Sequence, residues 1–311
     1  MKIASNIEDL KNILAEDKVF LTIGNFDGVH LGHQDFLNYI KNESQASHAK
    51  FVVITFVPHP SFVLQPKTNF LLNTYNERRD LLERLGVDVL LELDFTRDFS
   101  TQTPISFLND FVFSIAGLKK VFLGHDFHFG ANKEGNYALA KTIANTRNIE
   151  IILHSEFKLK NDKVSSSQVR EHLKAGDVEN ANGKLGREFF LSGRVIKGQG
   201  RGKQIGFPTA NLGYDKDIII PAKGVYATKT NINGMVYESV TNIGHNPTFN
   251  TGYDIHVETH ILGFNRDIYG ENIVVSFYKK LRDEKKFSSV NELVTQIDLD
   301  VDQVKKYYGK V

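Results

Sequence analysis

Apolar positions in the first half of the chain form short continuous runs, separated by stretches with helical spacing. Continuous runs are typical of strands in a sheet that is covered on both faces. They lie at Val19–Gly24, Phe51–Phe56, Val87–Leu93, Lys120–Gly124 and Ile149–Leu153. Helical spacing is found over Gln34–Lys41, Asn76–Leu85, Pro104–Ile115 and Glu134–Thr146. This alternation predicts an α/β domain with a Rossmann-like parallel sheet that binds ligands at the carboxyl ends of its strands.

The second half has a different pattern, in which strand-like runs are separated by turn signals such as Asn233-Gly234. The runs lie at Phe189–Ile196, Gly224–Thr230, Val236–Asn242, His256–Leu262 and Ile273–Leu281. A helical pattern returns over Val290–Tyr308. This order predicts an antiparallel β-barrel with a C-terminal helix. We expect the joint in the polar stretch Lys174–Gly186, with domains at residues 1–183 and 184–311.

Composition narrows the class of protein. A length of 311 residues is typical of two domains. A net charge of +1 does not indicate binding to an extended stretch of DNA or RNA. Residues 1–183 carry 20 basic and 23 acidic side chains, whereas residues 184–311 carry 18 basic and 14 acidic side chains. The second half is therefore mildly basic, which suits the binding of a small anionic ligand. The absence of cysteine excludes disulfides and thiolate metal sites. Without a signal-like or membrane-spanning apolar stretch, the sequence predicts a cytoplasmic protein with no membrane partner.

The first predicted strand leads into a turn rich in glycine and histidine, Gly24-Asn25-Phe26-Asp27-Gly28-Val29-His30-Leu31-Gly32-His33. Glycines let the backbone approach a ligand closely, and His30 and His33 lie on one face of the first helical turn. Free amide groups and the positive end of the helix dipole point the same way. The turn therefore predicts an anion site for nucleotide phosphates. The residues expected to form this site are Gly24, Phe26, Asp27, His30 and His33. His59, which follows the second strand, is expected to form another edge of the same nucleotide pocket.

Other interpretations of this turn stay open. His30 and His33 are also compatible with a pair of surface histidines. A metal pair is a further alternative, with His59 as the only obvious third ligand. Asp27 is compatible with a purely turn-forming role.

A second group of phosphate-binding candidates lies in Val164-Ser165-Ser166-Ser167-Gln168-Val169-Arg170. Ser166 and Ser167 can cap a helix or donate to phosphate. Arg170 can bridge phosphate oxygens with two N–H groups. A plain helix cap remains the alternative for the serines.

The stretch from Lys197 to Leu212 is the most specific in the chain. Glycines alternate with other residues and free the backbone to wrap phosphate, while basic side chains supply charge. The phosphate candidates are Gly198, Gly200, Arg201 and Lys203. Thr209 and Asn211 face the same way in an extended segment, and their oxygens suit Mg²⁺ carrying phosphates. A solvated basic turn is the alternative.

These motifs together resemble the bifunctional prokaryotic riboflavin kinases/FMN adenylyltransferases, the FAD synthetase family. The turn at Gly24–His33 resembles the form of the H-x-G-H nucleotidyltransferase signature that is found in bacterial FAD synthetases. Gly124–Gly130 and Val164–Arg170 resemble two further stretches of that family, with Val164 and Ser167 replacing its usual Ile and Thr. Gly200–Asn211 resembles the riboflavin kinase signature. Further similar stretches are Pro221–Tyr226, Thr241–Phe249, Val257–Leu262 and Asp267–Gly270.

The resemblance implies two reactions. The C-terminal module would phosphorylate riboflavin to FMN with ATP and Mg²⁺, and the N-terminal nucleotidyltransferase module would convert FMN and a second ATP to FAD and pyrophosphate. It implies His30 and His33 as catalytic residues and Glu258 as the base for the ribityl 5′-hydroxyl. By alternation Glu258 shares a strand face with His256 and His260, and the pattern leaves open which face is inward.

Flavin contacts are implied at four positions, with alternatives for each. Phe62 and Phe127 are candidates for stacking on the flavin ring, although each is also compatible with the core. Asp126 is expected to contact flavin or metal, and Arg266 to contact flavin or phosphate.

Two other functions stay open beside this one. An adenylyltransferase with another acceptor, such as nicotinate mononucleotide or phosphopantetheine, would need no second barrel. A non-enzymatic flavin- or nucleic-acid-binding protein would lack turnover, and the near-zero net charge disfavours nucleic acid. Homo-oligomerisation is left open by the sequence.

Overall fold

The computed structural model describes residues 1–65, 67–160, 162–198, 200–245 and 255–309, with the side chains of Arg201, Lys203 and His245 outside the described part. The chain forms two compact units. The first contains Met1–Lys67 and Asn73–Ser165, and the second contains Thr68–Leu72 and Ser166–Val311.

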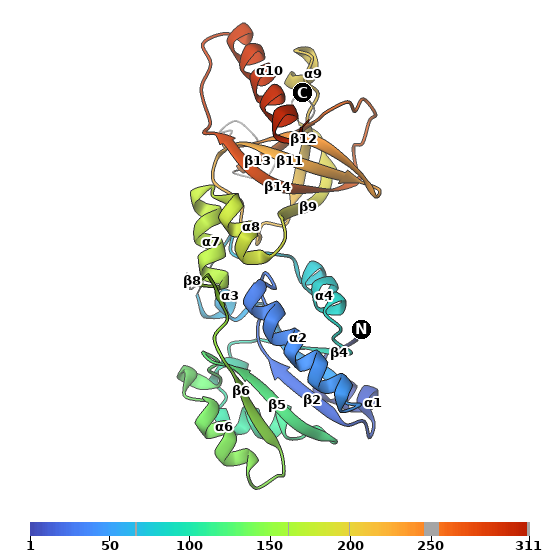
Figure 1. Cartoon of the computed structure of the whole chain (residues 1–311), viewed down its shortest axis with the longest axis vertical. Helices are drawn as coiled ribbons and strands as arrows, with labels where there is room; N and C mark the ends of the chain where they lie inside the picture. The colour runs from blue at the N-terminus through green and yellow to red at the C-terminus, as the bar shows by residue number, and fades with distance from the viewer. Residues whose placement is uncertain (66, 161, 199, 246–254, 310–311) are drawn as a thin grey trace. The chain divides into compact units, whose positions relative to one another are not determined.

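The first unit is built on the predicted parallel sheet, whose strand order is β1-β4-β3-β2-β5-β6 (Figure 1). Its strands are β1 (Lys2–Ala4), β2 (Val19–Ile23), β3 (Lys50–Val57), β4 (Val89–Asp94), β5 (Leu118–Gly124) and β6 (Glu150–His154). A short hairpin of β7 (Lys158–Leu159) and β8 (Asp162–Lys163) follows. Because β2 has β3 on one side and β5 on the other, the strand order reverses at the centre of the sheet, where ligands bind in such folds.

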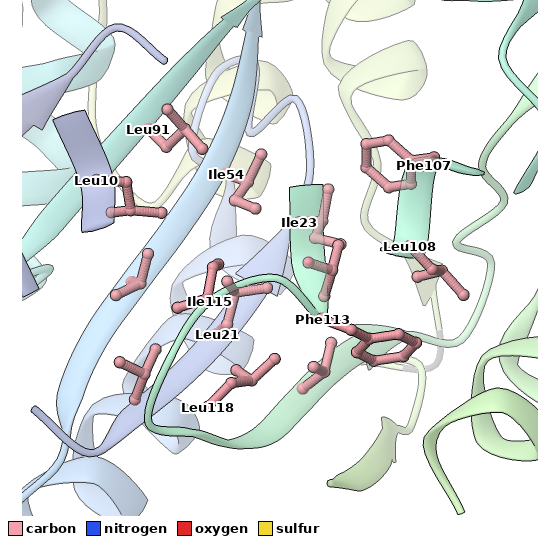
Figure 2. Close-up of a cluster of buried hydrophobic side chains, with 14 of the residues drawn as sticks. Leu10, Leu21, Ile23, Ile54, Leu91, Phe107, Leu108, Phe113, Ile115 and Leu118 are labelled. Carbon is pink, nitrogen blue, oxygen red and sulfur yellow. The ribbon is translucent and has the colours of Figure 1, made fainter. Parts of the chain in front are cut away.

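Helices cover both faces of this sheet. They are α1 (Ile7–Leu14), α2 (Leu31–Ala46), α3 (Pro60–Leu64), α4 (Tyr75–Arg84), α5 (Pro104–Phe107) and α6 (Tyr137–Ala144). Short 3-10 turns lie at Phe99–Thr101 and Ala131–Lys133, and a π-helical turn lies at Leu108–Val112. Alternate residues of β2 enter opposite cores: Phe20 packs in the cluster that contains Leu37 of α2 and Leu82 of α4, whereas Leu21 packs with Leu10 of α1. Figure 2 shows the second cluster, with Leu21, Ile23 and Ile54 among its members.

Three predicted helices differ from their expected bounds. The helix expected over Gln34–Lys41 is longer at both ends, because α2 extends from Leu31 to Ala46. The stretch expected as one helix over Pro104–Ile115 is helical from Pro104 to Val112, but it changes from α to π at Leu108, whose carbonyl accepts from the Phe113 N–H five residues later at 2.7 Å. The helix expected from Glu134 begins at Tyr137 instead, where the Asn136 side chain caps it by accepting from the Leu139 N–H at 3.1 Å.

The polar stretch expected to contain the joint is helical. It belongs to α7 (Ser166–Ala175) and α8 (Val178–Leu185), both in the second unit. Asp177 caps α8 by accepting from the Asn180 N–H at 3.2 Å, and Gly186 ends the helix with φ 69°. Asn182 then ties α8 to the barrel, donating to the Phe277 carbonyl at 2.8 Å and accepting from the Phe189 N–H at 2.7 Å.

The second unit contains the predicted antiparallel barrel, closed in the order β10-β13-β12-β11-β14-β9. Its strands are β9 (Phe189–Ile196), β10 (Ala210–Tyr214), β11 (Gly224–Ile232), β12 (Met235–His245), β13 (Ile255–Ile261) and β14 (Asn272–Arg282). The short helix α9 (Arg201–Gln204) precedes β10. The C-terminal helix α10 (Val290–Tyr307) lies against the barrel (Figure 1). Its Val301 and Val304 pack on Val225, Ala227 and Val240 of the barrel's outer face.

Candidate active sites

The turn after β2 lies at the central switch of the parallel sheet, and its backbone is strained. Phe26 and Val29 have φ 49° and 41°, values that non-glycine residues rarely adopt. Hydrogen bonds at both ends hold the turn: the Gly24 N–H donates to the Ile54 carbonyl at 3.0 Å, and the Gly28 N–H donates to Asn73 Oδ1 at 2.8 Å. Asp27 is buried. Strain that is maintained by the surrounding structure is typical of a functional site.

Phe26 supports the turn from the core side. Its ring is buried, and a Cβ added to Gly24 would lie 2.9 Å from it, so glycine is needed where the chain leaves β2. The same ring meets His33 edge-on at a centroid distance of 5.2 Å. Phe26 therefore holds the imidazole of His33 in place.

His30 and His33 form a stacked pair at the start of α2, with ring centroids 3.7 Å apart. His30 Nδ1 accepts from the His33 N–H at 3.3 Å and so caps the helix. Burial, together with the neighbouring His30, lowers the pKa of His33 well below its ordinary value, so His33 is neutral at pH 7. The His33 Nδ1 atom is buried without a hydrogen-bond partner among the residues that the structure describes. A buried polar atom in this state is suited to a ligand.

His59 lies at the same edge of the sheet, directly after β3. Its Nδ1 accepts from the Ser61 N–H at 3.1 Å and caps α3, which leaves the proton of a neutral ring on Nε2. Its backbone N–H donates to the Tyr75 hydroxyl at 2.8 Å. Phe62 is half-buried and edge-on to His59, with ring centroids 6.4 Å apart.

The remaining candidates of the first half occupy two other places. Asp126 is exposed in the loop after β5, and the half-buried Phe127 stacks on Phe129 at a centroid distance of 5.7 Å. Ser166 and Ser167 open α7, which belongs to the second unit. On the same helix Arg170 donates to the Phe70 carbonyl at 2.7 Å, with its guanidinium 3.8 Å from the centroid of the Phe70 ring.

In the second unit the strand register aligns candidates that are far apart in the sequence. Asn211 of β10 lies directly opposite Glu258 of β13, and Glu258 lies opposite Asn242 of β12. Directly opposed residues share a sheet face, so the three side chains form one row. Val257, Thr259 and Ile261 are buried inside the barrel. Glu258 is therefore on the outer face, the face that carries Val240 and packs against α10.

The glycine-rich loop passes against the end of this row. A Cβ added to Gly198 would lie 2.3 Å from Asn211 Nδ2, and one added to Gly202 would lie 2.3 Å from the Phe207 carbonyl oxygen and 3.4 Å from Thr209 Oγ1. Gly200 is exposed, with φ 69°. The backbones of Arg201 and Lys203 lie in α9, whereas their side chains fall outside the described part. Gly198, Thr209, Asn211 and Glu258 are thus brought together.

Asn242 in this row and Glu284 beside it were not named as candidates by the sequence analysis. A Cβ added to Gly244 would lie 2.6 Å from Glu284 Oε1 and 3.3 Å from Asn242 Nδ2. Asn242 could have been found from its place in the Thr241–Phe249 stretch, whereas nothing in the sequence marks Glu284. Arg266 lies in the loop after β13, paired with Glu271 at 3.1 Å and with its guanidinium 5.8 Å from the Phe264 ring centroid.

Metal and membrane features are limited in the part of the chain that the structure describes. It contains no group of three or more His, Cys, Asp or Glu side chains arranged to hold a metal ion. Among the same residues, no helix combines the length and apolar character needed to cross a membrane.

Family comparisons assign each half of the chain. The profile of a family described as riboflavin kinase matches residues 185–308, and that of a family described as FAD synthetase matches residues 13–168. A bifunctional riboflavin kinase/FMN adenylyltransferase of Bacillus subtilis (strain 168) is 35% identical over 302 residues, which cover 94% of each chain. The protein of the same name from Escherichia coli (strain K12) is 34% identical, with 99% of this chain and 98% of that one covered.

A solved structure has the same fold over nearly the whole chain. The crystal structure described as a macrolide-efflux protein from Streptococcus pneumoniae superposes with a TM-score of 0.84 and 31% sequence identity, covering 93% of this chain and 94% of that one. The similarity therefore extends across both halves, as it does for the sequence relatives.

Proposed function

Because the chain belongs to the bifunctional riboflavin kinase/FMN adenylyltransferase family, we propose which of its residues perform the two reactions. The C-terminal half phosphorylates riboflavin to FMN with ATP. The N-terminal half transfers AMP from ATP to FMN, giving FAD and pyrophosphate. We place the boundary between the two functional halves between residues 183 and 184. Because both reactions consume ATP, we also propose that the protein acts in the cytoplasm.

The kinase assignment rests on one observation, the register that sets Asn211 directly opposite Glu258. A primary alcohol is a weak nucleophile until its proton is accepted. Glu258 accepts the proton of the ribityl 5′-hydroxyl while that oxygen attacks the γ-phosphate of ATP. Gly198, Gly200, Arg201 and Lys203 hold the phosphates, and the close approach of Gly198 to Asn211 supports this. Arg266 contacts the flavin.

The same row fits Mg²⁺ delivered with the nucleotide. Thr209 and Asn211 offer neutral oxygen ligands, and Mg²⁺ usually keeps several waters and binds through few protein groups plus substrate phosphates. The lack of an acidic or histidine cage among the described residues agrees with this mode. When bound, Mg²⁺ neutralises charge on the transferring phosphates. Thr209 and Asn211 would hold the ion when it is bound.

The adenylyl-transfer site is the turn after β2. The attacking phosphate oxygen of FMN is already anionic, so positioning and charge neutralisation are the main tasks of the protein. His30 and His33 contact the phosphates at the start of α2, and the unpartnered Nδ1 of His33 supports this. The other proposed ATP contacts in the first unit are Gly24, Phe26, Asp27 and His59, and its proposed flavin contacts are Phe62, Asp126 and Phe127. Ser166, Ser167 and Arg170 of the second unit are proposed as phosphate contacts from their sequence motif alone.

Half-reaction assays on full-length variants test these roles. Protein is incubated with riboflavin, ATP and Mg²⁺, and the flavins are separated by chromatography. His33→Ala removes one preorganised group, which typically lowers a rate by about 10²–10³-fold, so FMN should accumulate while FAD formation falls. His48→Ala, just beyond the C-terminal end of α2, is the matched control. Parental FAD formation in both His30→Ala and His33→Ala would refute the site, and equal loss of both reactions would indicate a structural role.

A further inference from the structure

Arg78, in the first turn of α4, is an arginine that the two reactions do not yet use. It is among the largest fully buried side chains, with 2% of its surface exposed. A buried guanidinium must be paired or hydrogen-bonded, because removing a charge from water is unfavourable. Its Nη2 atom lies 3.3 Å from the carboxylate of Glu92 on β4, and that ion pair is itself buried.

Neutralising Glu92 does not require Arg78. The neighbouring Arg79 already donates to the same carboxylate through two nitrogens, with Nε at 3.0 Å. Arg79 is also partly exposed, at 34%, so its ion pair forms at a lower desolvation penalty. The buried position of Arg78 therefore needs another explanation.

Arg78 differs from Arg79 in reaching the carbonyl groups at the ends of two strands. Its Nη1 donates to the Asn25 carbonyl at 3.1 Å, and both terminal nitrogens lie 3.5 Å from the Phe56 carbonyl. Asn25 lies two residues after the end of β2 at Ile23 and precedes the strained residue Phe26. One planar guanidinium thus connects the carboxyl ends of β2 and β3, a geometry that a lysine cannot reproduce.

The start of α4 makes two more contacts with the same edge of the sheet. Asn73 accepts from the Gly28 N–H at 2.8 Å, and the Tyr75 hydroxyl accepts from the His59 N–H at 2.8 Å. The Tyr75 ring lies 5.0 Å from the Arg78 guanidinium. A reciprocal capping box between Thr74 and Glu77 holds this first turn rigid. The hydrogen bonds of Asn73 and Tyr75 thus end on the turn after β2 and on the neighbouring candidate His59.

We propose that Arg78 is a positioning residue for adenylyl transfer, which fixes the Asn25 peptide and with it the turn that holds the phosphates of ATP. The inference rests on the proposed assignment of that turn to ATP. Without Arg78 the Asn25 carbonyl keeps only the longer hydrogen bond from the Thr55 hydroxyl at 3.4 Å, so the peptide that precedes the positive-φ residue Phe26 is held less firmly. A shift of about 1 Å at such a site can cost about 10²-fold in rate.

The test compares Arg78→Met, Arg78→Lys and the matched control Arg79→Met in the full-length protein. For Arg78→Met we expect FAD formation to fall about 10²-fold in kcat, with a higher KM for ATP and an unchanged KM for FMN. Arg78→Lys keeps the buried charge beside Glu92 and should restore the melting temperature, while kcat stays at least about tenfold low because one ammonium cannot bridge both carbonyls. Arg79→Met should stay within about threefold of the parent. FMN formation by the second unit reports the integrity of the chain.

Two results would overturn the inference. Parental kcat and KM for ATP in Arg78→Lys would mean that charge alone suffices. An equal loss of kcat for FAD formation in Arg79→Met would mean that both arginines only neutralise the Glu92 carboxylate. If Arg78→Met does not fold, the lysine variant decides alone. His30→Ala distinguishes a wrong ATP site from a wrong role of Arg78. If His30→Ala spares FAD formation, the proposed ATP site is wrong. If His30→Ala abolishes FAD formation and the Arg78 variants are unaffected, only the role of Arg78 is wrong.

Discussion

Glu258→Gln is the sharpest perturbation of the kinase site. The substitution keeps the size of the side chain and its place between Asn211 and Asn242, but the amide cannot accept a proton. Glu258 is half-buried on the outer face of the barrel, so we expect the free energy of unfolding to change by about 0.5 kcal/mol or less. An effect on turnover can then be attributed to chemistry.

The magnitude follows from the loss of general-base catalysis. Removing a positioned base typically lowers a rate by about 10²–10⁴-fold, which corresponds to about 2.7–5.4 kcal/mol in the activation barrier. The affinities for riboflavin and nucleotide should change little, because the amide of the glutamine occupies the same place between Asn211 and Asn242 as the carboxylate. FAD formation from supplied FMN should persist, because that reaction belongs to the N-terminal half.

Glu284 is a second candidate for the general base. The Glu284 carboxylate lies beside Gly244 and Asn242, next to the same row. Riboflavin phosphorylation, FAD formation from FMN and riboflavin binding should therefore be measured on Glu258→Gln and Glu284→Gln in parallel. We expect Glu284→Gln to phosphorylate riboflavin within a few-fold of the parent. A kinase rate in Glu258→Gln within a few-fold of the parent, with a large loss in Glu284→Gln, would refute the reasoning and transfer the role to Glu284.

Two further predictions concern the loop and the histidine pair. Gly198→Ala places a methyl group where Asn211 Nδ2 would be 2.3 Å away, so Asn211 must move, and we expect a raised KM for MgATP in riboflavin phosphorylation; an unchanged KM would contradict the proposed contact. Burial depresses the pKa of His33 in the folded chain, so below about pH 6.5 the unfolded chain takes up a proton that the fold does not. The free energy of unfolding should fall between pH 7 and 5 by up to about 1.4 kcal/mol per pH unit, and urea titrations of His33→Gln should show a shallower fall; equal slopes in parent and variant would count against this account.

Local pattern was enough to predict the main strands. The continuous apolar runs became β2 to β6. In the central strand β2 every position is buried because helices cover both faces, as with Phe20 and Leu21 in opposite cores. The Asn233-Gly234 turn joins β11 and β12, with φ 51° and 88° at its two residues. The strand β10 was missed although Ala210, Leu212 and Tyr214 alternate as buried positions, because glycine and basic residues dominate the stretch before it.

Helix bounds were less predictable because side-chain caps decide them. Asn136 starts α6 later than its apolar spacing indicates, and Asp177 starts a helix in a stretch whose polar composition favoured a linker. Caps of this kind contribute about 1 kcal/mol each, which is enough to shift a boundary but too little to stand out in an apolar pattern.

By itself the sequence determined the two kinds of sheet, the turn at Gly24–His33, the glycine-rich stretch before Thr209 and, through resemblance, the pair of reactions. These features depend on residues that are neighbours in the chain, where spacing translates directly into a shared face or a tight turn. Only the tertiary structure decided that Glu258 lies on the outer face opposite Asn211, and that Arg78 holds the peptide of Asn25. Such pairs are 47 and 53 positions apart and meet through strand register and buried charge, which one-dimensional periodicity does not encode.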